Sequence, residues 1–464
     1  MVRVFRHYVP RSLMWLGVGE SLVLASSCYI ALTLALGDLL TTNGSANSLL
    51  PYMAGFVVVM LLSLFASGLY QLKLANNLPR TLSRLSAGVL AGSLLIALFA
   101  QVLSLGALTP TVIGSSIAIA LLGLVGTRLV FFSLCDAPAL QRQILVIGSG
   151  QQAQQLFNDV ESGLLKGINL CGFVPLDNHQ TNQVCQQSLI IPDSNILGLV
   201  TELNIDEIVI ALDDRRGVLP ADQILDCKMR GTRVTTLLDF LERHTGSIAV
   251  DSLNPSSMIF SDGYSGAALG DWRKRTFDLV VSSALLIVAL PVLALTTAAI
   301  WIECAGKSPI LYRQQRVGKH GREFSVLKFR SMCIDAEKNG AQWAATQDGR
   351  ITTVGRFIRQ TRIDELPQLL NVFKGEMSFV GPRPERPEFV AELNEAVPYY
   401  DIRHNTLPGI TGWAQVCYPY GASVDDARRK LQYDLYYMKN HSLFLDLTIL
   451  FQTVQVCIWS QGAR

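Results

Sequence analysis

The sequence predicts a multi-domain membrane protein: a four-helix transmembrane bundle, a Rossmann-like α/β domain and an α-rich C-terminal domain with a re-entrant membrane helix. Three features lead to this prediction: four long apolar stretches before residue 140, a strand–glycine–helix pattern after it, and a fifth apolar run flanked by basic residues. Half of the 464 residues are hydrophobic and 16% are charged, whereas soluble domains carry about 25% charged residues. This composition excludes a disordered chain and argues against a wholly soluble one.

The predicted boundaries are 1–140 for the bundle, 141–250 for the α/β domain, 251–270 for a linker and 271–464 for the C-terminal domain. The net charge of +2 argues against an overall polyanion-binding role, and no nucleic-acid partner is expected. Nine cysteines lie far apart without a C-x-x-C pair. This pattern is typical of free thiols in a reducing compartment.

Four apolar stretches within residues 1–140 each reach the length of about 20 residues that a helix needs to cross a bilayer. They are Leu13–Leu36, Leu49–Tyr70, Leu85–Leu105 and Val112–Cys135. The first stretch is too long for a cleavable signal peptide and lacks a clear cleavage site. We therefore expect four membrane-spanning helices.

Loop charges predict that both ends of this bundle face the cytoplasm. Basic residues lie before the first stretch, between the second and third, and after the fourth: Arg3, Arg6, Arg11, Lys73, Arg80, Arg84 and Arg142. The alternate loops, 37–48 and 106–111, contain neither lysine nor arginine. Because cytoplasmic loops are enriched in these residues, we expect the rest of the chain to begin in the cytoplasm.

Two ionisable residues lie inside the predicted spans at similar depths, Glu20 in the first span and Arg128 in the fourth. An isolated charge in the hydrocarbon costs roughly 2.5–3.5 kcal/mol. The matching depth fits an ion pair that fastens the two helices together. Alternatively, each side chain reaches the interface separately, and the sequence does not decide between these two arrangements.

Residues 141–250 follow the pattern of an α/β domain with a parallel sheet. The apolar strand within Gln143–Ala153 runs into the pattern G-x-G-x-x-A and then into a helical segment. Further strand-like runs at Glu207–Leu212 and Arg233–Leu237 alternate with helical segments such as Pro220–Arg230. This alternation predicts a Rossmann-like fold.

Gly148 and Gly150 of this pattern would let backbone amides approach the pyrophosphate of a bound nucleotide at a helix N-terminus. Alternatively, the glycines only permit a tight strand–helix turn. We favour the turn, because no clear acidic ribose ligand stands about 20 residues later. Asp177 is 29 residues beyond Gly148, in a loop-like stretch.

The polar stretch 251–270 is predicted to be a linker, and an apolar run from Phe277 to Ile302 follows it. Basic residues flank this run on both sides: Trp272-Arg-Lys-Arg before it, and Lys307, Arg313 and Arg316 after it. Pro291 at its middle removes a backbone hydrogen bond and bends a helix. We therefore expect a re-entrant helix at about 277–302 rather than a kinked fifth span, which would export everything after residue 302.

Five motifs crowd together after this run. They are Gln314–Gly318, Phe324–Met332, Arg359–Leu369, Ser378–Glu385 and Pro408–Val416. Within the third motif, Pro367 is tolerated only in the first turn of a helix, which predicts a helix start near Asp364. Asp364 and Glu365 then lie at the positive end of the helix, where phosphate groups bind.

Asp364 and Glu365 cannot do the same job, because neighbouring residues on a helix point in different directions. One carboxylate can face a phosphorus atom while the other holds a metal ion or orients a group. Arg359 and Arg362 precede the pair, and Arg383 stands between two prolines. Since arginine pairs bidentately with phosphate oxygens, the set indicates a site for a polyanionic phosphate substrate beside the membrane.

Together these motifs resemble the bacterial sugar transferase family, the monotopic polyprenyl-phosphate glycosyl-1-phosphate transferases, over residues 271–464. The preceding spans and Rossmann-like domain resemble the large members of that family. The segments Tyr418–Ser423 and Leu431–Tyr437 resemble the subgroup found with exosortase/PEP-CTERM exopolysaccharide systems. Many relatives have Asn-Gly after Ala-Gln-Val, whereas Cys417 and Tyr418 stand here, so no sugar preference carries over.

The resemblance implies an α-rich monotopic catalytic domain and a two-step reaction. Asp364 would attack the β-phosphorus of a UDP-sugar, expel UMP and form an aspartyl phosphosugar. A membrane polyprenyl (undecaprenyl) phosphate would then accept the phosphosugar. Glu365 would assist through Mg2+, held with Asp364, or by orienting groups. The cations expected to bind the substrate phosphates and nucleotide are Lys328, Arg330, Arg359, Arg362 and Arg383.

The resemblance also implies a multi-pass protein of the bacterial inner membrane, with a cytoplasmic catalytic domain that initiates exopolysaccharide or glycoconjugate synthesis. The sequence leaves open whether the protein forms a homo-oligomer. Two rival functions remain. An NAD-dependent nucleotide-sugar dehydratase or epimerase would need a Tyr-x-x-x-Lys pair, but Tyr264 is followed four residues later by Ala268. The second rival is a non-catalytic membrane scaffold or sensor that reads a nucleotide with the middle domain.

Overall fold

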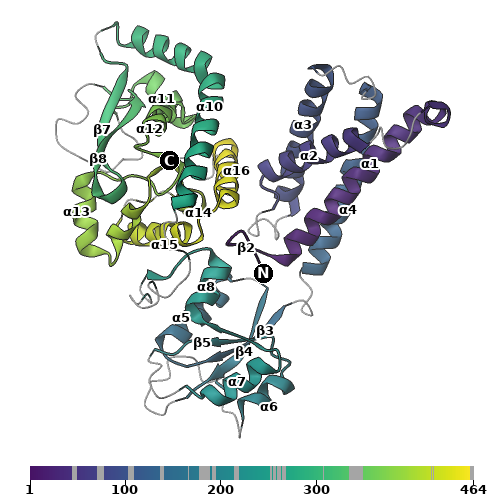
Figure 1. Ribbon diagram of the computed structural model, residues 1–464, viewed down its shortest axis with the longest axis vertical. Helices are drawn as coiled ribbons and strands as arrows, with labels where there is room; N and C mark the ends of the chain where they lie inside the picture. Colours follow the sequence, from purple (N-terminus) through teal and green to yellow (C-terminus); the bar gives the residue numbers. More distant parts are fainter. Residues whose placement is uncertain are drawn as a thin grey trace. The chain divides into compact units, whose positions relative to one another are not determined.

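Figure 1 shows the computed structural model of the chain, with its helices and strands labelled. The chain forms two compact units, one of Met1–Val2 with Tyr8–Gly246 and one of Arg3–His7 with Ser247–Arg464. The structure describes all residues except 44–49, 71–77, 103–108, 136–140, 166, 177–188, 191–194, 214–218, 251–252, 254–257, 259–262, 264–267, 307, 334–348, 420, 422 and 460–464. Lys73, Asp177, Tyr264 and Lys307 therefore lie outside the described residues.

In the first unit, helices form at each of the four predicted apolar stretches: α1 (Arg11–Asn43), α2 (Leu50–Ala66), α3 (Leu78–Val102) and α4 (Pro110–Cys135). Among the described residues, four helices are apolar and long enough to cross a membrane: α1, α3 and α4 of this unit, and Trp272–Glu303 of the second unit. Helix α2 is shorter, with 17 residues, at the lower end of the length that can span a bilayer.

Helix α3 begins earlier than the sequence predicted. Arg80 and Arg84 were expected in a loop before a span at Leu85, but they lie within the first turns of α3, which starts at Leu78. Pro79 is compatible with this start, because a proline in the first turn gives up no intrahelical hydrogen bond.

Glu20 and Arg128 form a buried ion pair, which confirms the first of the two predicted arrangements. Arg128 Nε lies 2.7 Å from Glu20 Oε1, and the two side chains are 4% and 0% exposed. Arg128 Nη1 also donates to the carbonyl of Leu69 at 2.9 Å, and the Tyr70 hydroxyl donates to Glu20 Oε2. The pair therefore joins α1, α4 and the turn after α2.

Residues 142–245 contain a parallel sheet of four described strands in the order β4-β3-β5-β6. The strands are β3 (Arg142–Ile147), β4 (Ile168–Val174), β5 (Glu207–Ile210) and β6 (Arg233–Thr236), and the helices are α5 (Gln151–Glu161), α6 (Ile196–Glu202), α7 (Ala221–Met229) and α8 (Leu237–Thr245). Figure 1 shows α5 and α8 on one side of the sheet and α6 and α7 on the other. The predicted parallel α/β arrangement is thus present, whereas its assignment to the Rossmann class stays a prediction.

The alternation of side chains along β3 explains this layering. Ile144 and Val146 pack with residues of α5 and α8, such as Leu156 and Phe240. The intervening residues of β3 point to the opposite face and pack with residues of α6 and α7. Because successive strand residues face opposite sides, a strand covered by helices on both faces is apolar throughout.

The longest helix of the second unit is α10 (Ala268–Glu303), which has 36 residues and contains Pro291. Helix α10 starts at Ala268, so the last three residues of the predicted linker are helical. Figure 1 shows α10 as two stretches that meet at a bend. The interior proline accounts for a bend, since it removes one backbone hydrogen bond and clashes with the preceding turn.

Both ends of α10 contact the rest of this unit. Near its start, the Lys274 ammonium lies 3.0 Å from Asp446 Oδ2, and Asp278 accepts hydrogen bonds from Ser378 Oγ and Phe379 N, each at 3.0 Å. At its end, Glu303 Oε1 accepts a hydrogen bond from Val354 N at 3.0 Å. Between these anchors lie strongly exposed apolar residues: Val280, Ile287, Val288, Leu290 and Leu295.

The remaining elements of the second unit are short helices and two small sheets. They are β7 (Leu311–Val317), η6 (Lys319–Gly321), β8 (Glu323–Phe329), α11 (Thr353–Gln360), η7 (Ile363–Gln368), α12 (Leu369–Lys374), β9 (Ser378–Val380), α13 (Pro387–Ala396), η8 (Tyr400–Asn405), β10 (Gly409–Thr411), α14 (Trp413–Cys417), α15 (Val424–Asn440) and α16 (Leu443–Trp459). Strands β7 and β8 form an antiparallel hairpin, and β9 pairs with β10 in parallel. Two further short strands, β1 (Val2–Val4) and β2 (His7–Val9), lie near the N-terminus.

Candidate active site

Asp364 and Glu365 lie in η7, a 3₁₀ helix that leads directly into α12. The expected helix start near Asp364 is thus present, but as a tighter 3₁₀ turn. Arg362 precedes it with a φ of 59°, a left-handed conformation that side chains seldom adopt. The chain therefore changes direction sharply at Arg362, just before η7. Pro367, which has no N–H to donate, lies within η7 itself, and this short helix carries both carboxylates.

Glu365 is held by three cations from three parts of the chain. Lys328 Nζ on β8 lies 3.0 Å from Glu365 Oε1, and Arg383 Nη2, after β9, lies 2.9 Å from the same oxygen. Arg362 Nη1 is 3.9 Å away. Burial opposes ionisation, but these cations outweigh it and keep the pKa of Glu365 well below its usual range. Glu365 is therefore a fixed anion.

Asp364 has a different environment although it is the next residue. Burial and the neighbouring charge of Glu365 raise the pKa of Asp364, while Lys328, Arg362 and Arg359 oppose the rise. Its Oδ1 atom is buried and has no hydrogen-bond partner among the described residues. A buried carboxylate oxygen without a partner is costly unless a ligand uses it. Asp364 thus differs from Glu365 in having a buried oxygen without a partner among the described residues.

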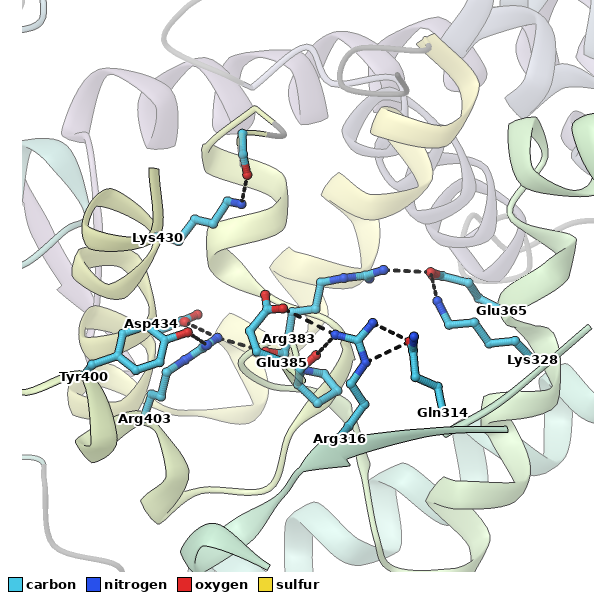
Figure 2. A network of polar contacts seen from close by, with 12 residues as sticks. Gln314, Arg316, Lys328, Glu365, Arg383, Glu385, Tyr400, Arg403, Lys430 and Asp434 are labelled. Carbon is cyan, nitrogen blue, oxygen red and sulfur yellow. Dashed lines mark hydrogen bonds and ion pairs between the residues drawn. The ribbon is translucent and has the colours of Figure 1, made fainter. Parts of the chain in front are cut away.

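Side chains of strand β7 hold the loop that carries Arg383 in place. Figure 2 shows Arg316 of β7 beside this loop, where its Nη1 donates to the carbonyl of Pro384 at 3.1 Å and contacts Glu385 Oε2 at 3.3 Å. Gln314 Oε1 accepts from Nη2 of the same arginine at 2.6 Å. The motif Gln314–Gly318 therefore supports the loop with Arg383, a role that the sequence alone did not reveal.

Comparison with known proteins matches this second unit to a family. The family model described as bacterial sugar transferase covers residues 269–460. The UDP-galactose-lipid carrier transferase of Erwinia amylovora is 30% identical over 341 residues, which are 70% of this chain and 69% of that protein. This chain belongs to the bacterial sugar transferase family. The predicted family is confirmed, while the exosortase-associated subgroup stays a prediction.

Two further relatives of the sugar transferase have names that state an activity. The UDP-N-acetylgalactosamine-undecaprenyl-phosphate N-acetylgalactosaminephosphotransferase of Aeromonas hydrophila is 40% identical over 241 residues, 51% of this chain and 55% of that protein. The undecaprenyl-phosphate glucose phosphotransferase of Komagataeibacter xylinus is 33% identical over 335 residues, 70% of this chain and 60% of that protein. The matched region thus spans about half to three fifths of these two relatives.

The structure of this sugar transferase brings together most of the residues that the motifs suggested. Lys328, Arg362 and Arg383 contact Glu365, and Arg359 is among the cations that act on Asp364. The described contact of Arg330 is with another segment: its Nε donates to the carbonyl of Pro309 at 2.9 Å. Arg330 also lines an open hollow of about 700 Å³ with Pro309–Arg313. Its proposed contact with substrate phosphate stays a prediction.

A divalent cation such as Mg2+ fits the two carboxylates only with help from a substrate. Asp364 Oδ1 is without a protein partner in the described part of the chain, whereas Glu365 Oε1 already contacts Lys328 and Arg383. Within the described residues, no group of three or more His, Cys, Asp or Glu side chains could hold a metal ion. The remaining ligands would be phosphate oxygens and water, which is the usual coordination of Mg2+ in enzymes.

The glycines of the middle domain are explained by close packing. A Cβ atom at Gly148, where φ is 123°, would lie 2.2 Å from the carbonyl oxygen of Ala211, and one at Gly150 would lie 2.0 Å from Asp213 Oδ2. The Asp213 carboxylate accepts hydrogen bonds from Gln151 N at 2.9 Å and Gln152 N at 3.1 Å. These are the amides that would bind a pyrophosphate, so the contacts favour the tight-turn interpretation. Nucleotide binding there stays a prediction.

The cysteines with described side chains form no disulfide bond among themselves, and the absence of a disulfide framework from the whole chain stays a prediction. Six of the nine lie among the residues whose side chains are described, and all six are free thiols: Cys28, Cys171, Cys227, Cys304, Cys333 and Cys417.

Proposed function

We propose that this sugar transferase moves a sugar-1-phosphate from a UDP-sugar to undecaprenyl phosphate and so initiates exopolysaccharide or glycoconjugate synthesis. The names of the relatives from A. hydrophila and K. xylinus support a transfer to undecaprenyl phosphate. The main observation from this chain is the contrast between the two neighbouring carboxylates. Glu365 is fixed by cations, whereas Asp364 has a buried oxygen without a partner among the described residues.

In the first step, an Asp364 carboxylate oxygen attacks the β-phosphorus of the UDP-sugar. A bond from this oxygen to phosphorus forms, the bond from phosphorus to the bridging oxygen breaks, and UMP leaves with that oxygen and its electron pair. The product on the enzyme is an acyl phosphate that carries the sugar. Burial disfavours the charge of the free carboxylate, and bond formation to phosphorus removes that charge.

In the second step, a phosphate oxygen of undecaprenyl phosphate attacks the same phosphorus atom. The bond to Asp364 breaks, the carboxylate is restored, and an undecaprenyl diphosphate sugar is released. One phosphoanhydride bond is broken and another is formed across the whole reaction, so no further energy source is required. Each step transfers a phosphoryl group between oxygens, and catalysis then depends on positioning and on charge stabilisation.

Glu365 has a supporting role in this mechanism. Its contacts with Lys328 and Arg383, at 3.0 and 2.9 Å, orient both cations toward the position of the diphosphate. Arg359 and Arg362 add positive charge beside Asp364. Mg2+, held by Asp364 and Glu365 together with the diphosphate, would neutralise further charge.

We also propose that α10 is re-entrant. Both of its ends are anchored to the same unit, through Asp278 and Glu303. The helix contains Pro291, and Figure 1 shows that it bends along its length. The exposed apolar residues between these anchors have the character of a surface that lies in lipid. A helix that enters and leaves on one side would hold the carboxylates near the headgroups, within reach of a lipid phosphate.

The residues before the first membrane helix support a cytoplasmic position of the catalytic unit. Residues Arg3–His7 belong to the second unit, where His7 Nδ1 lies 3.0 Å from the Tyr436 hydroxyl. The first membrane helix begins shortly afterwards, at Arg11. Together with the basic loop residues, this favours a cytoplasmic catalytic unit on the inner membrane.

The proposed reaction is tested with full-length protein in liposomes that contain undecaprenyl phosphate, by measuring UMP release from a panel of UDP-sugars. We expect UMP release with at least one sugar, a loss of several orders of magnitude in Asp364→Asn, and a phosphosugar adduct on Asp364 detectable by mass spectrometry. Asp401→Asn is the matched control, because the Asp401 side chain is 79% exposed. Wild-type turnover in Asp364→Ala would refute the nucleophile, and absence of UMP release with every sugar would refute the reaction.

A further inference from the structure

The loop that carries Arg383 depends on donors from other elements. Pro382 and Pro384 have no backbone N–H and cannot donate within the loop. Four consecutive carbonyls instead accept hydrogen bonds from elsewhere. Pro382 O accepts from Gly409 N at 2.9 Å, Arg383 O from Arg403 Nη2 at 2.9 Å, Pro384 O from Arg316 Nη1 at 3.1 Å, and Glu385 O from Val317 N at 2.9 Å.

The donor to Arg383 itself is part of a buried cluster. Arg403 belongs to η8 and is 6% exposed, and Asp434 belongs to α15 and is 2% exposed. Arg403 Nη2, which donates to Arg383 O, also lies 2.8 Å from Asp434 Oδ2, and Arg403 Nη1 donates to the Tyr400 hydroxyl at 2.6 Å. Figure 2 shows Arg403 between Asp434 and the loop.

The guanidinium of Arg403 therefore joins three segments that are distant in the sequence. Its donors point in fixed directions in one plane, so an acceptor on one side determines what the other donors can reach. Burial raises the pKa of Asp434 to about 6 although Arg403 opposes the rise, and Glu385 and Lys430 are the other charged groups that act on Asp434. The Asp434 carboxylate thus bears a burial cost that the contact with Arg403 offsets.

We propose that Arg403 and Asp434 are positioning residues for phosphosugar transfer, which act by fixing the backbone of Arg383 so that its side chain reaches Glu365 and the substrate diphosphate. This inference rests on the proposed function. Neither residue touches Asp364 or Glu365 in the described contacts; both act through Arg383, whose Nη2 lies 2.9 Å from Glu365 Oε1. The competing interpretation is a purely structural ion pair between η8 and α15.

The variant Arg403→Lys separates the two interpretations, because a lysine keeps the charge opposite Asp434 but lacks the planar fork that also reaches Arg383 O and Tyr400. Asp434→Asn is the second variant and keeps the size and one acceptor oxygen. Arg243→Lys is the matched control. It makes the same change in another buried arginine–carboxylate pair, Arg243 with Glu207 at 2.6 Å, which belongs to the first unit.

The first measurement is a double-mutant cycle on kcat/KM for UMP release. Since a small displacement of a positioned group can cost about a hundredfold in rate, we expect Arg403→Lys to lower kcat/KM at least tenfold in the wild-type background. In the Arg383→Ala background, the same change should alter kcat/KM less than twofold, because the side chain that Arg403 positions through this backbone is absent. Arg243→Lys should leave kcat/KM unchanged. An Arg403→Lys effect of equal size in both backgrounds would overturn the proposal.

The second measurement does not require turnover. Hydrogen exchange of the full-length protein reports directly on the backbone amides of the four non-proline residues between 381 and 386, which are Gly381, Arg383, Glu385 and Arg386. We expect these amides to exchange at least tenfold faster in Arg403→Lys and Asp434→Asn than in wild type, while α12 and α13 keep their protection, which shows that the unit is folded. Unchanged exchange of residues 381–386 would overturn the positioning role even if the enzyme transferred sugar. Absence of UMP release from wild type would refute only the proposed reaction.

Discussion

The clearest consequence of the site geometry concerns Glu365→Gln. Glu365 Oε1 accepts two charge-assisted hydrogen bonds, from Lys328 at 3.0 Å and from Arg383 at 2.9 Å. Glutamine keeps the acceptor oxygen but removes the charge. Removing one charge of a buried hydrogen-bonded charge pair costs about 2–5 kcal/mol. We expect the lower part of this range, about 2–3 kcal/mol, because glutamine still accepts from both cations and their side chains are partly exposed, at 18% and 30%.

If both cations must be in place when phosphorus is attacked, this loss appears in the barrier. It corresponds to a decrease in kcat/KM of roughly 30- to 160-fold. The same substitution should also change the pH dependence. The negative charge of Glu365 is one of the two causes that raise the pKa of Asp364, the other being burial. Without that charge, the pKa of Asp364 should fall.

In the proposed reaction the attacking group is the ionised carboxylate of Asp364, so we expect activity to rise with pH as Asp364 loses its proton. A lower pKa of Asp364 therefore moves the acidic limb of the kcat/KM profile to lower pH in Glu365→Gln, while the plateau is lower. UMP release measured from pH 5 to 9 gives both quantities. Glu392→Gln is the control, because Glu392 lies in the same unit but is exposed on α13. A limb displaced to higher pH, or a plateau within threefold of wild type, would refute this account.

Three further predictions concern other parts of the chain. Glu20→Gln and Arg128→Met should each lower the free energy of unfolding by about 3–5 kcal/mol, because each leaves a buried partner uncompensated. The double variant should lose less than the sum of the two, so additive losses of melting temperature in nanodiscs would contradict the ion pair. NAD should not raise the melting temperature of the wild-type protein, since Asp213 already accepts from the α5 amides; saturable stabilisation by NAD would contradict this. Cys333, which is free and exposed, should react with a membrane-impermeant maleimide in inside-out vesicles and not in intact cells; the reverse pattern would place the catalytic unit outside.

The sequence by itself predicted features that depend on neighbouring residues. A long apolar stretch becomes a helix because every backbone polar group must be satisfied locally where water is absent. For the same reason, α1 to α4 occur at the predicted stretches. The strand–glycine–helix pattern predicted the β3–α5 unit, and Pro367 predicted a helix start near Asp364. The motifs also identified the family, because its residues follow one another in a fixed order.

Tertiary structure decided which side chains meet. The sequence left two arrangements open for Glu20 and Arg128, and only the packing of α1 against α4 brought their side chains to 2.7 Å. Lys328 and Arg383 were both candidate phosphate ligands, but their shared contact with Glu365 requires β8 and the loop after β9 to converge. Arg403, Asp434 and Asp213 were missed because each acts on a segment far away in the sequence. Local patterns encode the formation of helices and strands through short-range energetics, whereas partners from distant segments are set by how those elements pack.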